Sequence, residues 1–231
     1  GVTDSDTKQT RVLSIDTEIP EHWEITSVGD ISILVTDGAH LTPEKSDSGY
    51  YLLGARNVQN GYIDLESADY VSSEEYERLI EKCHPEPNDI LMSCRGVGLG
   101  RIGLMPEGLE CALLCSAALI KLSESVHPEY IEKALRHIDT QKQIKALQTQ
   151  SAQPNLFQNE IARLEFPLPP IEEQEKIANI LSRYDEQIQH EQEYKEQLNR
   201  LKHGLLQDLL SGTVRTTDTN IEVPDEIEQY G

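Results

Sequence analysis

Four polar loops carry most of the side chains in this sequence that could do chemistry. Arginine side chains pair with guanine edges, and asparagine or glutamine side chains pair with adenine edges. Glycines beside them let the backbone approach a phosphate closely. The candidate residues are Thr36, Asp37, Gly38 and His40 in the first loop, Arg56 and Asn57 in the second, Arg95, Gly96 and Arg101 in the third, and Gln153 and Asn155 in the fourth. These loops are candidates for DNA contacts, and ordinary surface turns are the simpler alternative for each.

The sequence offers no complete catalytic centre. Asp37 and His40 share a loop, but no serine or cysteine nucleophile can be placed against them. The glycine-rich residues 95–100 lack the Lys–Ser/Thr of a phosphate-binding loop. A Glu-x-Lys nuclease pattern at residues 193–195 falls in a predicted helix, and residues 168–171 lack the flanking residues of an amino-methyltransferase motif. We therefore expect a chain that is not an enzyme and carries no cofactor of its own.

The four cysteines do not have the spacing of a zinc finger or zinc ribbon. They are Cys83, Cys94, Cys111 and Cys115, and the last two lie within an apolar run. Buried reduced thiols are the preferred interpretation, so we expect no metal site. Metal binding is the alternative.

The formal net charge is −21 over 231 residues. Such acidity argues against nucleic-acid binding, because affinity for phosphates depends on Lys and Arg. The acidic composition also resembles that of proteins from salt-accumulating halophiles, in which surface acidity is an adaptation to the solvent and says little about the ligand. The charge therefore weakens a DNA-binding hypothesis without excluding it. No apolar run approaches the roughly 18 residues of a membrane span, and the start shows no signal segment, which favours the cytoplasm.

Residues 168–212 are predicted to form one long helix. Apolar residues recur at steps that are almost all three or four positions, and they form a single stripe along its surface. The stripe consists of Ile177, Leu181, Tyr184, Ile188, Tyr194, Leu198, Leu201, Leu205 and Leu209. About 40 residues at about 1.5 Å each give a rod of about 60 Å, which a domain of this size cannot cover. We expect the stripe to pair with a second helix.

The residues before this helix predict an α/β (α+β) globular domain. Short apolar stretches broken by Gly, Asp and Asn are typical of strands, as at residues 61–65 and 111–120. One helix is expected to begin at Ser72 or Ser73 and another to cover residues 127–148. The predicted parts are a mobile amino-terminal segment (1–17), the globular domain (18–167), the helical arm (168–212) and a polar tail (213–231).

Several segments together resemble the DNA-specificity subunit of type I restriction–modification systems. They are residues 19–23 (IPEHW), 36–43 (TDGAHLTP), 88–92 (NDILM) with Arg95–Gly96, 168–174 (LPPIEEQ) and 205–212 (LLQDLLSG). The first of the helical segments, LPPIEEQ, is the most specific of them. The resemblance implies a target-recognition domain, similar to that of TaqI-type adenine methyltransferases, followed by a coiled-coil-forming helix.

The usual subunit of that family has two such units, whereas this chain has one. Two options follow: half of a longer protein, or a half-size subunit that dimerises. A symmetric dimer would read a bipartite palindrome, with the helices fixing the gap between half-sites.

The resemblance also implies partners and their cofactors. Double-stranded DNA would face the loop residues named above, with Arg95 as the strongest candidate. A separate modification subunit would hold S-adenosylmethionine, and a motor–nuclease restriction subunit would use ATP and Mg²⁺. The alternative function is a structural coiled-coil adaptor without DNA binding, which the net charge favours.

Overall fold

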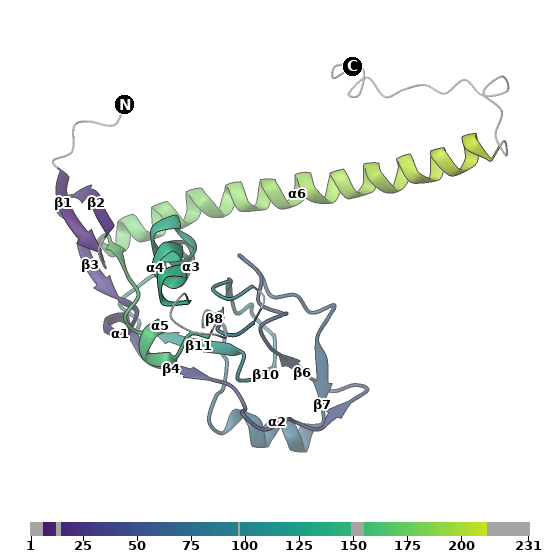
Figure 1. Cartoon of the computed structure of the whole chain (residues 1–231), viewed down its shortest axis with the longest axis horizontal. Helices are drawn as coiled ribbons and strands as arrows, with labels where there is room; N and C mark the ends of the chain where they lie inside the picture. The colour runs from purple at the N-terminus through teal and green to yellow at the C-terminus, as the bar shows by residue number, and fades with distance from the viewer. Residues whose placement is uncertain (1–6, 13–14, 97, 149–154, 212–231) are drawn as a thin grey trace. The chain divides into compact units, whose positions relative to one another are not determined.

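The computed structural model describes residues 7–12, 15–96, 98–148 and 155–211 (Figure 1). Contacts divide the chain into two compact units, Gly1–Leu181 and Ser182–Gly231. The first unit mixes two central sheets with short helices, and a long helix continues into the second. This confirms the predicted fold class. The predicted tail 213–231 lies outside the described residues.

The amino-terminal segment contains a β-hairpin. β1 (Thr7–Val12) pairs antiparallel with β2 (Ile15–Pro20) along their whole length. The structure thus shows a strand pair within residues 1–17, and the mobility of this segment stays a prediction. Both strands contain β-branched residues, which suit extended structure, and pairing satisfies main-chain groups of a segment whose composition is polar.

The two ends of the globular unit meet in a second strand pair. β3 (Glu24–Ser27) lies antiparallel to β12 (Glu165–Leu168). The one-turn helix α1 (Val28–Ile31) follows β3 directly. It is capped because the backbone N–H of Asp30 donates to Ser27 Oγ at 3.3 Å, while the backbone N–H of Ser27 donates to the Asp30 carboxylate at 3.2 Å. This capping box marks the point where the strand ends and α1 begins.

Two four-stranded sheets form the centre of the unit. The first has the order β4–β11–β8–β9 and is antiparallel throughout. In the second, ordered β10–β6–β7–β5, only the pair β10 and β6 is parallel. Their strands are β4 (Ser32–Asp37), β11 (Ala117–Leu122), β8 (Ile90–Ser93), β9 (Ile102–Leu104), β10 (Cys111–Leu113), β6 (Tyr50–Leu53), β7 (Asp69–Val71) and β5 (Lys45–Ser46).

Three predicted elements differ from the structure. The apolar run 111–120 is two strands, because the chain turns at residues 115–116 and passes from the second sheet to the first. Residues 61–65 form no strand, and an isolated bridge joins Val58 to Ile63 instead. The helix predicted over 127–148 is divided into α3 (Pro128–Arg136) and α4 (Ile138–Gln148).

The division between α3 and α4 lies at His137, whose backbone is extended. Side chains of α4 take over carbonyls that a continuous helix would have paired through its backbone. Thr140 Oγ1 donates to the carbonyl of Ala134 at 2.9 Å, and Gln141 Nε2 donates to that of Leu135 at 2.9 Å. Apolar periodicity does not reveal this break, because both halves keep helical spacing.

Helices pack against both central sheets. The helix α2 (Ser73–Ile80) starts at the predicted cap, Ser72, and packs against β10. On the first sheet, α3, α4 and the short α5 (Gln158–Ile161) contribute to one buried cluster. Its largest fully buried members include Phe166, Met92, Ile120 and Ile131. This core holds the ends of β4 and β8, where the candidate loops begin.

The long helix α6 (Ile171–Leu210) is confirmed as one continuous element of 40 residues. Its first turns are part of the globular unit. Gln174 is buried there, where its Oε1 accepts from the backbone N–H of His127 at 2.9 Å and its Nε2 donates to the Pro169 carbonyl at 2.8 Å. Ile177 also packs on the core of its own unit. Because Ile177 is only half-buried, its role in pairing with another helix stays a prediction.

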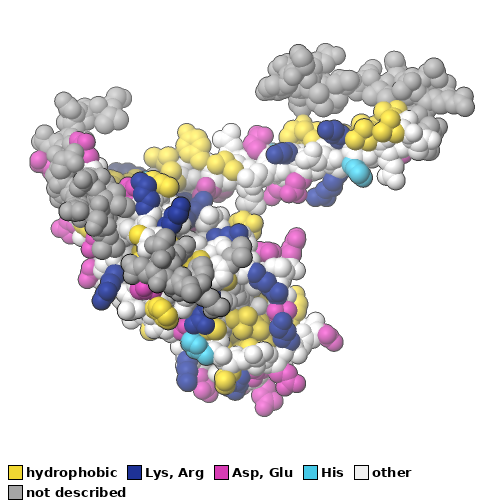
Figure 2. All heavy atoms as spheres, in the orientation of Figure 1, with side chains coloured by type: hydrophobic (Ala, Val, Ile, Leu, Met, Phe, Trp, Pro, Cys, Tyr) yellow, Lys and Arg dark blue, Asp and Glu magenta, His cyan; other side chains and the backbone are white. Residues whose placement is uncertain are grey.

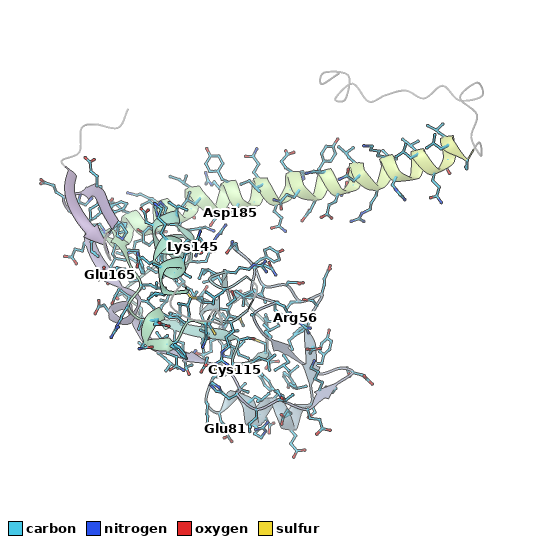
Figure 3. All side chains as sticks on the ribbon, in the orientation of Figure 1. Arg56, Glu81, Cys115, Lys145, Glu165 and Asp185 are labelled. Atoms are coloured by element: carbon cyan, nitrogen blue, oxygen red, sulfur yellow. The ribbon has the colours of Figure 1, made fainter. Side chains whose placement is uncertain are left out.

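Beyond Leu181, the helix exposes large apolar side chains to solvent (Figure 3). Tyr184 is 62 % exposed, Ile188 54 % and Leu201 58 %. These residues belong to the predicted stripe and remain available for a partner. None of the helices in the described residues is both long enough and apolar enough to cross a membrane.

Candidate nucleic-acid interface

Asp37, at the end of β4, is the centre of a polar cluster. Its Oδ1 accepts a hydrogen bond from Gln158 Nε2 at 2.8 Å and lies 3.2 Å from His40 Nε2. Its Oδ2 lies 3.6 Å from Arg95 Nη2. We call Asp37, His40, Arg95, Asn155 and Gln158 the Asp37 cluster. Three loops that are distant in sequence therefore meet at one carboxylate.

Arg95 directly follows β8 and joins two of these loops. Its backbone pairs with that of Asn155 in an isolated bridge, and its Nη1 lies 3.4 Å from Cys115 Sγ. The buried Arg95 Nε and Asn155 Oδ1 have no hydrogen-bond partner among the described residues. Arginine has five N–H donors, and the Arg95 side chain is 37 % exposed. It thus retains donor capacity for an external acceptor such as a base edge.

Two predicted glycines of this region have different roles. A Cβ on Gly38 would lie 2.1 Å from the Leu113 carbonyl oxygen, so this residue lets the first loop pass close to β10. Gly96 has φ +77° and open space around its missing side chain. Gly38 is therefore required by packing and Gly96 by backbone conformation. Thr36 lies within β4, half-buried and paired with Leu119 of β11.

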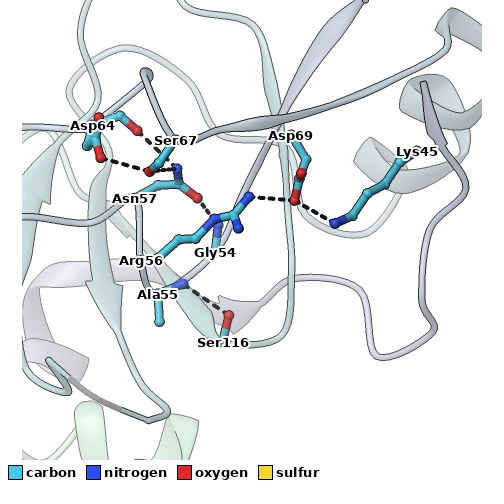
Figure 4. A network of polar contacts seen from close by, with 9 residues as sticks. All are labelled: Lys45, Gly54, Ala55, Arg56, Asn57, Asp64, Ser67, Asp69 and Ser116. Carbon is cyan, nitrogen blue, oxygen red and sulfur yellow. Dashed lines mark hydrogen bonds and ion pairs between the residues drawn. The ribbon is translucent and has the colours of Figure 1, made fainter. Parts of the chain in front are cut away.

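The second predicted loop forms a separate network (Figure 4). Asn57 is buried; its Oδ1 accepts from the backbone N–H of Gly54 at 2.9 Å, and its Nδ2 donates to the Asp64 carbonyl at 3.0 Å and Ser67 Oγ at 3.3 Å. These contacts use its amide inside the protein. The prediction that Asn57 faces DNA is therefore corrected: it holds the loop in place.

Arg56 is the exposed member of this second loop. Its Nη2 lies 2.6 Å from Asp69 Oδ2, and Lys45 Nζ lies 2.8 Å from the same oxygen. The hydrogen bond from Lys45 is the main reason that the pKa of Asp69 is below its usual value, with a smaller contribution from Arg56. The two cations share a single carboxylate.

The turn between β10 and β11 connects the two sites. Cys115 contacts Arg95 on one side, and Ser116 Oγ accepts from the backbone N–H of Ala55 at 3.0 Å on the other. Figure 3 labels Cys115 and Arg56, which both belong to the globular unit. Figure 2 shows Lys and Arg side chains interspersed with Asp and Glu over the visible face of this unit. Although the chain has a net negative charge, this visible face is therefore not uniformly acidic.

The remaining predicted residues lie outside the Asp37 cluster or outside the described residues. Arg101 precedes β9, where its carbonyl accepts from the backbone N–H of Ser93 at 2.9 Å and closes the third loop. Gln153 lies outside the described residues. Sequence reasoning missed Gln158 and Cys115. Gln158 reaches Asp37 across 121 positions, and no spacing in the sequence signals such a contact.

The cysteines show no sign of nucleophilic chemistry. Burial raises the pKa of the Cys83 and Cys111 thiols to about 12 and that of Cys94 to about 11. Thiols with such pKa values stay protonated at neutral pH and are poor nucleophiles and metal ligands. No metal-binding group of His, Cys, Asp or Glu occurs within the described part of the chain. The predicted burial is confirmed for Cys83, Cys94 and Cys111, whereas Cys115 is half-exposed.

Comparisons with known proteins agree on one family. The model of the type I restriction modification DNA specificity domain matches residues 20–200. Two similar proteins of Methanocaldococcus jannaschii are assigned as type I restriction enzyme specificity subunits. The MjaX subunit is 30 % identical over 84 % of this chain and 47 % of its own length, and the MjaVIII subunit is 25 % identical over 88 % and 49 %. The chain thus spans about half the length of these relatives.

Solved structures show the same fold. A specificity subunit from M. genitalium aligns with a TM-score of 0.57 at 15 % identity, over 80 % of this chain and 45 % of that chain. The HsdS subunit from Thermoanaerobacter tengcongensis aligns with a TM-score of 0.54 at 17 % identity, over 88 % and 52 %. In both, the match again covers about half of the longer chain.

Proposed function

The chain belongs to the family of type I restriction modification DNA specificity domains, and we propose that it recognises one half-site of a DNA target. Arg95 carries this proposal. It is a partly exposed arginine at a strand end, and its guanidinium group lies beside an aspartate, an asparagine and a glutamine. This is the set of side chains that can read base edges in the major groove.

The two loop sites have different roles in this proposal. The Asp37 cluster reads bases, because its amide and guanidinium groups have directional hydrogen-bonding capacity. Arg56 and Lys45 bind backbone phosphates, because they are about half exposed and are balanced by one shared carboxylate. Asn57 and Gly38 have a structural role, because they hold these loops in position.

The long helix sets the distance between half-sites and docks the modification subunits. Its exposed apolar residues beyond Leu181 support pairing with a helix of a second copy, or with the corresponding helix of a longer specificity subunit. The chain itself is non-catalytic in this proposal. S-adenosylmethionine belongs to the modification subunit, and ATP and Mg²⁺ belong to the restriction subunit. The complex acts on DNA in the cytoplasm.

The competing function is a coiled-coil adaptor without DNA binding, and the net charge of −21 is what favours it. The two functions differ in one measurable property. Methylated adenines can be mapped across the genome with and without this gene. If the chain directs recognition, the map contains a bipartite motif whose methylation is lost when the gene is removed. An unchanged methylation pattern supports the adaptor.

Binding measured with the modification partner present provides a second test. Specific affinity should fall steeply as the salt concentration rises, because phosphate binding releases counterions. Equal affinity for the mapped motif and for a scrambled duplex at every salt concentration would argue against a recognition role.

A further inference from the structure

Two large apolar side chains are exposed beside the Asp37 cluster. Leu41 is 72 % exposed and directly follows His40, whose ring reaches Asp37. Phe157 is 58 % exposed and directly precedes Gln158, whose amide reaches the same carboxylate oxygen. Each of the two apolar residues is therefore the direct sequence neighbour of a side chain that contacts Asp37.

The backbone around Phe157 is firmly held although its side chain is exposed. Leu156 is buried in the core, and its N–H donates to the carbonyl of Cys94 at 2.9 Å. The N–H of Phe157 donates to Glu160 Oε2 at 2.8 Å at the start of α5. Phe157 thus lies on a fixed backbone, two residues after Asn155, whose backbone pairs with that of Arg95.

This ring is not part of the buried core. The chain contains two phenylalanines; Phe166 is 1 % exposed and fills the centre of the unit, whereas Phe157 is 58 % exposed. A single exposed apolar residue is ordinary. Here two of them border a cluster whose arginine and amide groups have the chemistry of base recognition, so a ligand that covers the cluster would also cover the ring.

We propose that Phe157, together with Leu41, determines specificity by packing against the 5-methyl group of a thymine next to the base pair that Arg95 reads. The thymine methyl is the apolar group on the major-groove edge of the base pairs, and aromatic and aliphatic side chains contact it. The inference rests on the proposed function, since it requires the Asp37 cluster to lie on a major groove.

Deoxyuridine substitution tests the contact, because it removes the methyl group and leaves base pairing unchanged. Each thymine of the mapped target is replaced in turn, and binding of the full chain with its modification partner is measured. For the unmodified protein, one position should weaken binding about 4-fold, the value of one buried methyl group. In Phe157→Ala, the same replacement should have no effect.

Phe157→Leu is the conservative variant and should retain most of the deoxyuridine effect. Circular dichroism of both variants checks the fold, which the exposed position of the ring should leave intact. Additive losses from Phe157→Ala and deoxyuridine overturn the inference, as does a target in which no thymine responds. A target bound specifically and sensitive to Arg95→Ala, with silent thymines, rejects the thymine contact alone. If the unmodified protein shows no specific binding to the mapped target, the proposed function is rejected as well.

Discussion

Trp23 Nε1 donates a hydrogen bond to Glu173 Oε2 at 3.1 Å, and His22 Nε2 lies 2.8 Å from Oε1 of the same carboxylate. The contact joins the segment before β3 to the first turn of α6. These are two of the segments by which the sequence resembles specificity subunits. Glu173 also occupies the positive end of the helix dipole, where a carboxylate is stabilised. We infer that this carboxylate anchors the base of the long helix.

Glu173→Gln should lower the free energy of unfolding by about 1 kcal/mol at neutral pH, because a charge-assisted pair on a partly exposed group is lost. Hydrogen bonds from His22, then from Trp23, hold the pKa of Glu173 below its ordinary value of 4.5. A carboxyl whose pKa is lower in the folded state stabilises the protein above its unfolded pKa. That contribution disappears as the pH falls through the folded pKa.

Chemical denaturation of both proteins at a series of pH values measures this difference. The destabilisation by Glu173→Gln should be full above about pH 5 and shrink below the ordinary carboxyl pKa. Glu172→Gln is the matched control, since Glu172 is an exposed neighbour in the same helical turn. Equal destabilisation by the two substitutions would show that the effect comes from the helix dipole and not from a specific anchor at Glu173.

Gly38→Ala should destabilise the globular unit more than Gly96→Ala does. The first substitution places a methyl group 2.1 Å from a backbone oxygen, and relief of that clash requires movement of β10, at a cost of about 3 kcal/mol. The second meets open space and adds only the strain of a positive φ, about 1 kcal/mol. Urea midpoints at constant slope decide the order. A reversed order would show that the first loop does not pack on β10 in solution.

Arg95→Ala should weaken specific DNA binding by about 1–3 kcal/mol, the range for a bidentate base contact, and relax specificity at one base pair. Arg78→Ala is the control: this arginine lies on α2, is 51 % exposed, and pairs with Glu75. It should change affinity little. Competition between the mapped target and single-base variants measures both effects. A uniform loss over all sequences would assign Arg95 to a phosphate instead.

Ile188→Asp should convert a self-associated chain into monomers, because it places a charge within the exposed apolar stripe of α6. Gln189→Asp adds the same charge at the next position, off the stripe, and should leave association intact. Sedimentation velocity over a range of protein concentrations distinguishes these results. A monomeric unmodified chain would instead support pairing with the other half of a longer subunit.

Local sequence patterns are sufficient for the elements whose signals lie within a few residues. The long helix follows from apolar residues at helical spacing, and Ser72 at the start of α2 follows from capping chemistry. The first polar loop and Arg95 follow from residue type and position at strand ends. The predictions of the long helix and of Ser72 are confirmed because hydrogen bonds and apolar faces of one segment determine them, whereas DNA contact by the first loop and Arg95 stays a prediction.

The tertiary structure alone decided which polar residues face inward and which loops meet. Asn57 and Arg56 are adjacent in sequence, yet one is buried in a network and the other exposed. Gln158 joins the Asp37 cluster across 121 positions, and the break between α3 and α4 depends on side chains that replace backbone donors. Such outcomes depend on the packing of distant segments, because a buried polar group takes whichever partner the fold brings within hydrogen-bonding distance.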